Sequence, residues 1–522
     1  MPNTKLKKWG LNILISLPII PIGLVIGYIN LYSGIDVSIR LYISLILVCT
    51  YLAIILLRIY FLKEKNKIGI RIISVAALIL LLGSSYGAYA SISIYNSINQ
   101  MIKTQSEVNY SLVTMVDSGL ASTNELEGGV IATLNLADDR VVNAIDDFLE
   151  EELTSTNRVL KYDSPVSMVH DLYNGEVDAM VIGSNFVSLF SDNRGFENIL
   201  RETQTLETFT VVTENVNTNP NNNLITEDPF SILLLGTNSM EEGQIDSGQV
   251  NTLILVTVNL QNLSVTMTSV PRDSYVSVPC VNNNAMDKLS HTHSSGTMCV
   301  LQTVEHIMGV EIPYYAKLNF RGMVDLVDTL GGIEVDVPVT IKEQNSRRQF
   351  GEHEITVEEG LQRLDGEQAL AFSRHRRTFL NGGDLVRANH QQLVLSGILN
   401  RLLLETSSVN EILAILNVLG ENVDTNLSMG EITSLGQYML DTFSTVDTSN
   451  PLEEIHIKNT VLSGQEGFVD TIYYEFPLSV LHLYEESIAE ERQSILINLG
   501  QMEPVYNYEF TFDGFNDNST TY

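Results

Sequence analysis

The chain has 522 residues, enough for several domains, and it carries 63 acidic against 30 basic residues, for a net charge of −33. So acidic a surface repels nucleic acid and anionic headgroups unless its cations are gathered in one place. Ten cations lie in residues 1–103, and twelve of the other 20 lie between Arg272 and Arg387. Nucleic acid is therefore not an expected partner. The twelve cations between Arg272 and Arg387 indicate either an anion-binding site or salt bridges on a solvated surface.

Three hydrophobic stretches open the chain, at Leu11–Tyr32, Ile39–Leu62 and Ile68–Ile94. Each can cross a bilayer, which takes a helix of about 20 residues. Lysines precede the first stretch and basic residues separate the second from the third, whereas residues 33–38 hold no lysine or arginine. The positive-inside rule then predicts a multi-pass membrane protein with a cytoplasmic N-terminus and its main domains outside. We expect residues 1–96 to form a three-span anchor; three buried core helices are the alternative.

Residues 97–215 alternate between strand-like and helix-like segments. The segments "GGVIATLNL" and "VDAMVIGS" predict strands, and "DDRVVNAIDDFLEEEL" and "SPVSMVHDLYNG" predict amphipathic helices. We expect an accessory α/β domain with no catalytic constellation, and we interpret His170 as structural. Residues 216–229 follow as a linker rich in Asn, Thr and Pro.

Strands and helices alternate again from Phe230. The segments "SILLLG", "NTLILVTVN", "LSVTMT" and "EVDVPVTI" predict strands. Two helices are predicted at "TMCVLQTVEHIMG" and at "FRGMVDLVDTLGG", where the glycines end the helix, and a longer one at "GDLVRANHQQLVLSGILNRLLLE". This order predicts an α/β sandwich with a mixed sheet over residues 230–420, an α/β extension over 421–505 and a polar tail over 506–522.

The cations within residues 230–420 lie on separate segments of the chain. Arg272 and Asp273 end a strand in "TSVPRDSYVSVP", where an ion pair within a turn is the alternative to a site. Arg374 and Arg376 alternate in "FSRHRR", which predicts one face of a strand. Asp384 is placed to cap the next helix at its positive end. The remaining candidates are Lys288 in a loop, and Arg387 and Gln391 on one face of that helix. Several guanidiniums from separate loops suit a diphosphate, because Arg binds phosphate oxygens bidentately.

Two cysteines, Cys280 and Cys299, lie in the part expected outside the membrane. That compartment permits a disulfide, which would contribute about 3 kcal/mol by closing a loop of this length. Two free thiols are the alternative. Cys49 lies in the second hydrophobic stretch, and no Cys or His spacing suggests zinc.

Five motifs in order now resemble one family: "SVPRDSYVSVP", "DKLSHTHSSG", "YYAKLNFRGMVDLVDTLGGIEVDVP", "LDGEQALAFSRHRR" and "GDLVRANHQQ". Over about residues 230–420 the chain resembles the LytR-CpsA-Psr family, and its anchor with an accessory domain resembles the capsule-type branch. The resemblance implies an α/β sandwich with a mixed central sheet and an apolar lipid tunnel. It also implies attachment to a bacterial cell membrane.

The resemblance further implies a phosphotransferase that moves a glycopolymer, such as a capsule or teichoic acid polymer, from a polyprenyl pyrophosphate carrier to peptidoglycan. The new bond is a phosphodiester, and other wall-assembly proteins are possible partners. The residues matching the family's catalytic positions are Arg272, Asp273, Arg374, Arg376, Asp384 and Arg387. Those matching its pyrophosphate-binding positions are Arg272, Lys288, Arg374, Arg376, Arg387 and Gln391.

The chain departs from the family at the expected Mg²⁺ or Mn²⁺ site. Asn238 and Asn251 stand where the family has aspartates, and Gln249 stands for an arginine. With Asp273 they form a weak candidate metal site, because amides offer an oxygen without charge. Carboxylates from the same loop are possible substitutes, or are simply solvated: Glu241, Glu242 and Asp246. Asn389 also replaces a frequent arginine.

Two hypotheses of different class follow. The first is an active glycopolymer transferase with altered metal use. The second is a catalytically impaired member that binds polyprenyl-linked glycans, as an assembly subunit or regulator of cell-wall polymers. The retained arginines suit both, and the missing carboxylates favour the second.

Overall fold

The structure is a computed structural model. It describes residues 14–103, 105–154, 156–190, 195–214, 225–240, 249–281, 284–349, 351–376, 383–404, 408–445, 456–469 and 477–503. The expected tail and most of the expected linker lie outside these ranges.

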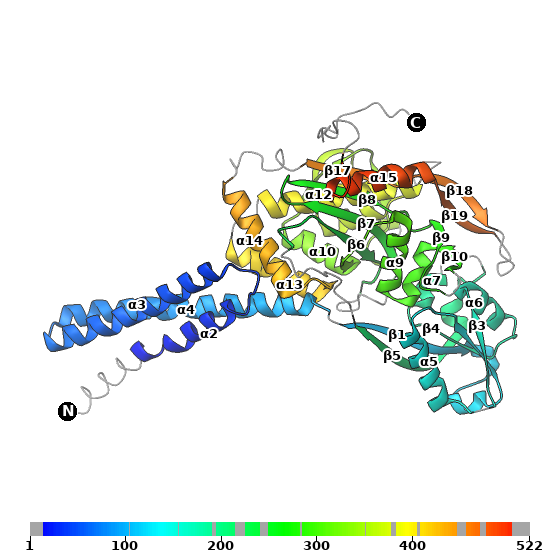
Figure 1. Ribbon diagram of the computed structural model, residues 1–522, viewed down its shortest axis with the longest axis horizontal. Coiled ribbons are helices and arrows are strands. Elements are labelled where there is room, and N and C mark those ends of the chain that lie inside the picture. The colour runs from blue at the N-terminus through cyan, green and yellow to red at the C-terminus, as the bar shows by residue number, and fades with distance from the viewer. Residues whose placement is uncertain are drawn as a thin grey trace.

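The N-terminal helices form a stalk that projects from the rest of the molecule (Figure 1). It consists of α2 (Ile19–Ile29), α3 (Val37–Lys63) and α4 (Lys67–Met101). Among the described residues, α3 and α4 are long and apolar enough to cross a membrane, and the apolar helix Leu14–Ile29 is shorter. Two such helices are therefore present where three were predicted.

The first helix is short because a turn at residues 17 and 18 interrupts it before α2 begins. Pro18 has no backbone N–H to donate into a helix interior. Even counted through the turn, the 16 residues 14–29 reach about 24 Å at a rise of about 1.5 Å each, less than the ~30 Å of a hydrocarbon core. The side chains of Asp36 and Asn66 cap α3 and α4 by accepting hydrogen bonds from backbone N–H groups.

A five-stranded sheet with order β3-β2-β4-β1-β5 follows the stalk. The predicted strands are present as β2 (Val130–Leu134) and β4 (Ala179–Gly183), and the predicted helices as α5 (Asp139–Glu152) and α6 (Pro165–Tyr173). Two long antiparallel strands, β1 and β5, were not predicted because they are polar at many positions. The remaining elements are β1 (Gln105–Met115), β3 (Arg158–Tyr162), α7 (Phe186–Phe190), α8 (Ile199–Glu202) and β5 (Thr203–Glu214). We call residues 105–214 the accessory module.

The larger part is built on a six-stranded sheet with order β16-β11-β6-β7-β8-β17. Strand β11 pairs parallel to β6, and β17 parallel to β8, whereas β6, β7 and β8 are antiparallel. The expectation of an α/β architecture with a mixed central sheet is therefore confirmed. The strands are β6 (Phe230–Thr237), β7 (Val250–Asn259), β8 (Ser264–Ser269), β11 (Tyr314–Asn319), β16 (Val423–Thr425) and β17 (His456–Val461).

Helices cover this sheet on both faces (Figure 1). One face buries Leu233, Leu255 and Tyr315 against α9 and α15. The other packs Ile254, Val256 and Met267 against Leu395 of α12. The helices are α9 (Thr297–Met308), α10 (Phe320–Thr329), α11 (Gly366–Arg374), α12 (Gly383–Leu404), α13 (Val409–Asn422), α14 (Met429–Thr445) and α15 (Glu485–Asn498).

The described part of the chain also contains four small two-stranded sheets: β9 (Tyr275–Ser277) with β10 (Met286–Lys288), β12 (Ile333–Val337) with β15 (Gly360–Leu364), β13 (Ile341–Glu343) with β14 (Ile355–Val357), and β18 (Gly464–Val469) with β19 (Leu478–Leu483). The predicted helix stop at "LGG" is present, since Gly331 and Gly332 follow α10 with φ of 73° and 90°. The strand predicted at "FSRHRR" is wrong. Helix α11 runs through Arg374, because its Asp365–Gln368 capping box starts a helix that its buried apolar residues continue.

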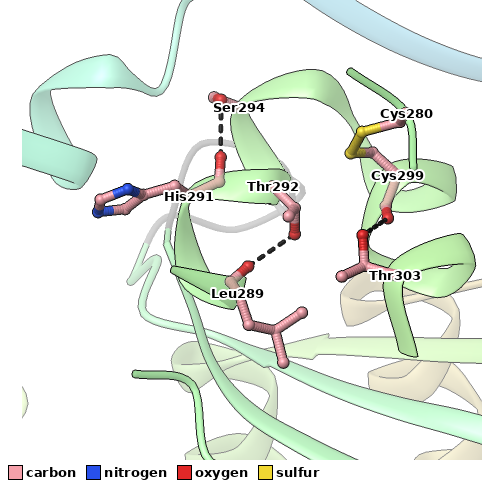
Figure 2. The surroundings of a disulfide bond; sticks show 7 residues. All are labelled: Cys280, Leu289, His291, Thr292, Ser294, Cys299 and Thr303. Atoms are coloured by element: carbon pink, nitrogen blue, oxygen red, sulfur yellow. Dashed lines mark hydrogen bonds between the residues drawn. A yellow bond between two sulfur atoms is a disulfide. The ribbon is translucent and has the colours of Figure 1, made fainter. Parts of the chain in front are cut away.

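A disulfide loop joins the accessory module to the larger part. Cys280 and Cys299 form a disulfide with Cα atoms 5.4 Å apart, and the 3₁₀ helix η5 (Leu289–Ser295) lies in the loop that it closes. In Figure 2, the side chain of His291 in η5 points away from the disulfide. The N–H of Ala137 donates to the Cys280 carbonyl at 2.9 Å, and the Phe190 ring lies 6.5 Å from that of His291.

Candidate functional site

A polar pocket of about 680 Å³ lies at one end of the central sheet. Its walls come from the end of β6, the start of β7, the segment after β8, the loop around η5, and α11 and α12. The described residues that line it are Asn238, Gln249, Asn251, Arg272, Asp273, Lys288, Ser290, His291, Phe320, Glu343, Gln344, Arg348, Arg374, Arg376, Arg387, Gln391, Leu478 and Ser479. Six cations face two carboxylates there, so this pocket has an excess of positive charge in an acidic chain.

Every candidate catalytic, pyrophosphate-binding or metal-binding residue whose side chain the structure describes lines this pocket, whereas the two cysteines do not. The side chain of Asp384 lies outside the described residues, although its backbone belongs to α12. Arg377 and the loop carboxylates Glu241, Glu242 and Asp246 also lie outside them. Sequence reasoning missed Phe320, Glu343 and Arg348.

Arg272 is held by neutral groups. Its Nη1 donates to Oε1 of Gln249 at 3.3 Å and also to Oδ1 of Asn251. Amide oxygens orient the guanidinium without adding negative charge, and its carboxylate partner, Asp273, is shared with Lys288. Its Nε is buried and has no hydrogen-bond partner among the residues that the structure describes. Such a buried donor is costly unless a ligand satisfies it, so Arg272 is prepared for an anion.

Asp273 lies between two of the cations. Lys288 Nζ is 2.6 Å from its Oδ1, and Arg272 Nε is 3.9 Å from its Oδ2. Burial alone would raise the pKa of the Asp273 carboxyl, but the charges of Lys288, Arg272 and Arg387 outweigh it and hold that pKa well below its usual range. Asp273 therefore stays ionised and fixes the positions of both cations.

Arg374 comes from the C-terminal end of α11. Its Nη1 donates to the Asn345 carbonyl at 3.3 Å, and its guanidinium carbon lies 5.5 Å from the centroid of the Phe320 ring. Burial, with Arg348 nearby, lowers the pKa of Arg374, although an arginine remains charged at neutral pH. The stacked, hydrogen-bonded guanidinium has a fixed orientation towards the pocket.

Glu343 adds the second carboxylate. It is buried, its Oε2 lies 3.3 Å from Nδ1 of His375, and its Oε1 accepts a hydrogen bond from the Gln344 N–H at 3.1 Å. Behind it, burial and the nearby His375 lower the pKa of His390 to about 4, which keeps that imidazole neutral near pH 7. The sequence held a signal for Glu343, a charged residue at an inward position of the alternating strand "IKE".

The described donor set does not fit a divalent cation. Oδ1 of Asn238 accepts from the Gln249 N–H at 2.8 Å, and Oδ1 of Asn251 accepts from Arg272. Asp273 is engaged by Lys288. Within the described ranges there is also no group of three or more His, Cys, Asp or Glu side chains that could hold a metal. The oxygens expected to bind a metal are instead engaged by a backbone N–H, a guanidinium and an ammonium of the protein itself.

Comparison with known proteins covers the same part of the chain. The sequence model of the LytR_cpsA_psr family matches residues 196–475. The polyisoprenyl-teichoic acid–peptidoglycan teichoic acid transferase TagU of Enterococcus faecalis is 34% identical over 214 residues, 41% of this chain and 66% of that protein. The Bacillus subtilis transferase of the same name is 32% identical over 249 residues, 48% of this chain and 72% of its own.

Solved structures also match. The crystal structure of TagV from B. subtilis aligns with 53% of this chain and 99% of its own, at 25% identity and a TM-score of 0.43.

Proposed function

Because the chain belongs to the LytR-CpsA-Psr family, we propose that it is a membrane-anchored, extracytoplasmic phosphotransferase. It moves a glycopolymer from a polyprenyl pyrophosphate carrier to peptidoglycan and forms a phosphodiester. The observation that carries the proposal is the pocket of six cations and two carboxylates, in which amide oxygens orient Arg272 and one carboxylate, Asp273, is shared between Arg272 and Lys288. A pyrophosphate is a ligand of matching charge and oxygen geometry.

The pyrophosphate is bound by arginines that cannot lose their charge at neutral pH. Arg272 and Lys288, both fixed by Asp273, hold one side, and Arg374, stacked on Phe320, holds another. Arg376, Arg387 and Gln391 line the same space. Fixed cations favour the transition state, because negative charge develops on the transferred phosphoryl group and the bridging oxygen.

Glu343 is the general base in this proposal. The neighbouring cations keep Asp273 ionised at neutral pH and make it a weak base, which leaves Glu343 as the other carboxylate in the pocket lining. It takes the proton of the acceptor sugar hydroxyl, whose oxygen attacks the phosphorus that carries the glycan. A P–O bond to the acceptor forms, the P–O bond to the bridging oxygen breaks, and polyprenyl phosphate leaves with the electron pair.

The lipid part of the carrier is proposed to lie in an apolar tunnel beside the sheet. The apolar layer of Ile254, Val256 and Met267 against Leu395 supports this position, since Leu395 lies on the helix that carries Arg387 into the pocket. We further propose that the chain enters the membrane a third time through the apolar stretch Leu11–Tyr32, although its described helix Leu14–Ile29 is by itself shorter than the hydrocarbon core, and that the N-terminus is cytoplasmic. Capsule or teichoic acid polymers are the proposed cargo.

A binding subunit without catalytic activity is the second candidate. It is favoured by the amides at Asn238 and Asn251, whose oxygens are already hydrogen-bonded within the pocket. If the reaction requires a metal at this position, the cations alone would bind the carrier without transferring it.

One experiment separates the two candidates. The full-length protein in nanodiscs is incubated with a synthetic polyprenyl-pyrophosphate oligosaccharide and peptidoglycan fragments, and mass spectrometry follows the phosphodiester product. Arg374→Ala is the test variant, and Arg363→Ala, an exposed arginine paired with Glu334 outside the pocket, is the matched control. Product lost only in Arg374→Ala supports the transferase, whereas carrier binding without product supports the binding subunit.

A further inference from the structure

The stalk is held against the larger part at a defined height along α4. This helix begins at Lys67, directly after the basic turn that ends α3. The 20 residues from Lys67 to Tyr86 span about 30 Å, the thickness of a hydrocarbon core. Tyr86 therefore marks the level where α4 leaves the hydrocarbon core on the far side from Lys67.

Helix α13 packs parallel to α4 from that level onward. Tyr86 Oη donates to Oδ1 of Asn410 at 2.7 Å, and Ser97 Oγ donates to Oδ1 of Asn417 at 2.7 Å. A Cβ at Gly420 would lie 2.9 Å from the Ser97 carbonyl oxygen, so the two backbones are in close contact there. The first turn of α13 is thus level with Tyr86, and its later turns rise away from the membrane.

Helix α14 is tied to the same end of the stalk from another direction. The N–H of Gly34, in the turn between α2 and α3, donates to Oγ1 of Thr433 at 3.1 Å. The N–H of Asp36 donates to Oε1 of Gln437 at 2.9 Å. In Figure 1, α14 lies at the end of the larger part nearest the stalk.

Exposed apolar side chains lie next to these contacts on α13 and α14. Leu440 follows Gln437 by three residues and Thr433 by seven, so it shares their face of α14, yet it is 70% exposed. Met439 beside it is also exposed. On α13, Val409 is 51% exposed and Ile412 is exposed one turn later. The α13 pair lies at the level of Tyr86, and the α14 pair lies beside the contacts with the turn between α2 and α3, on the same side of the membrane.

We propose that these four residues, Val409, Ile412, Met439 and Leu440, form a bilayer seat that lies in the headgroup–acyl boundary of the leaflet facing the larger part. The covalent continuity of α4 and the contacts of Tyr86 and Gly34 place the seat against lipid rather than another protein. The seat rests on the membrane anchoring in the proposed function and is independent of the transfer reaction. It keeps α12 and the pocket at a fixed distance from the leaflet that holds the carrier's lipid.

The seat is tested by depth-dependent fluorescence quenching. Cys49, a free cysteine in α3, is replaced by alanine in the parent protein, while Cys280 and Cys299 stay bonded and unlabelled. A polarity-sensitive dye is attached to the full-length protein through Leu440→Cys, and nanodiscs contain phosphatidylcholine with a shallow or a deep nitroxide lipid. The expected result is a blue-shifted emission that the shallow nitroxide quenches more than the deep one.

Two matched labels make the result decisive. Phe468→Cys replaces an apolar residue of similar exposure, 72%, on β18, which Figure 1 places far from the stalk; it should be quenched by neither lipid. Leu52→Cys, exposed on α3, should be quenched most by the deep lipid. If Leu440→Cys behaves like Phe468→Cys while Leu52→Cys is quenched, the seat is wrong and the anchor stands. If Leu52→Cys is not quenched either, both the anchor and the seat are wrong. Ile412→Cys repeats the measurement on α13, in case labelling at Leu440 disturbs α14.

Discussion

The ammonium of Lys288 lies 2.6 Å from Oδ1 of Asp273, and this ion pair joins the loop around η5 to the turn that carries Arg272. Both side chains are largely buried. The carboxylate thus compensates cations that would otherwise repel each other in the free protein. A bound pyrophosphate can also compensate the charge of these cations.

Asp273→Asn should destabilise the free protein by about 3–5 kcal/mol, as expected when one partner of a buried ion pair is removed. Added pyrophosphate should raise the midpoint of thermal unfolding more in the variant than in the unchanged protein, because the anion replaces the missing charge. Differential scanning calorimetry of the protein in nanodiscs measures both effects. An equal pyrophosphate response in the two proteins would contradict this role of Asp273.

The same pair has a defined pH dependence. The folded pKa of Asp273 is depressed, so its contribution to stability is complete above its unfolded pKa of about 3.9 and is lost as pH falls through the folded value. The stability difference between the unchanged protein and Asp273→Asn should therefore be constant from pH 6 to 8 and shrink only in strong acid. A difference that changes near neutral pH would show that another group is involved.

Arg374→Lys tests the fixed guanidinium orientation. Lysine keeps the charge but cannot stack its fork on Phe320 or reach the Asn345 carbonyl in the same way. Charge-assisted hydrogen bonds contribute about 1.5–3 kcal/mol each, so carrier binding should weaken by about 10–100-fold. Microscale thermophoresis with a polyprenyl pyrophosphate measures it, and Arg363→Lys should bind normally.

Glu343→Gln tests the proposed base. Glutamine keeps the shape and the acceptor for the Gln344 N–H but cannot take a proton. The turnover rate should fall by about 10²–10⁴-fold, while KM for the carrier changes little. Glu334→Gln, on the exposed edge of β12, is the control. A Glu343→Gln variant with normal turnover, or with only a raised KM, would remove Glu343 from the chemistry.

Strands β6, β7 and β8 of the central sheet were predictable because they are rich in apolar and β-branched residues, and helices α9, α10 and α12 because apolar periodicity and helix ends are local features. The other strands of this sheet, β11, β16 and β17, were not predicted; they are more polar or very short. "FSRHRR" misled because alternation over so few residues cannot distinguish a strand from a helix end; the Asp365 capping box upstream decides it. Strands β1 and β5 escaped because they are polar at many positions and become strands by pairing with each other.

The site was predictable only where a motif carried it. Arg272 and Lys288 lie within recognisable motifs, but no local pattern could show that the side-chain oxygens of Gln249 and Asn251 accept hydrogen bonds from Arg272. That contact depends on β7 and the turn after β8 meeting at one end of the sheet. The sequence alone suggested Asn251 as a weak metal ligand. The structure instead shows its side-chain oxygen accepting a hydrogen bond from Arg272.

The hydrogen bond between Arg272 and Asn251 leads to a prediction about metal chelation. Since the described oxygens of Asn238, Asn251 and Asp273 already have protein partners, EDTA should leave carrier binding unchanged. The double variant Asn238→Asp/Asn251→Asp places carboxylates there, and its carrier binding should become dependent on Mg²⁺. Isothermal titration with and without EDTA compares the two proteins. Loss of binding by the unchanged protein in EDTA would show that a cation is held by residues outside the described ranges.

The disulfide loop should couple the accessory module to the pocket. Cys280→Ser/Cys299→Ser removes a covalent link across 19 residues, with an expected cost of about 3 kcal/mol. Lys288 lies inside the loop, and the Cys280 carbonyl accepts the Ala137 N–H of the accessory module. Hydrogen exchange should therefore speed up in residues 284–299 and also around Ala137, and carrier binding should weaken through Lys288. The matched control is Cys49→Ser, which should change neither. Faster exchange confined to the loop, with normal exchange around Ala137, would show that the module is held by its other contacts, such as Phe190 with His291.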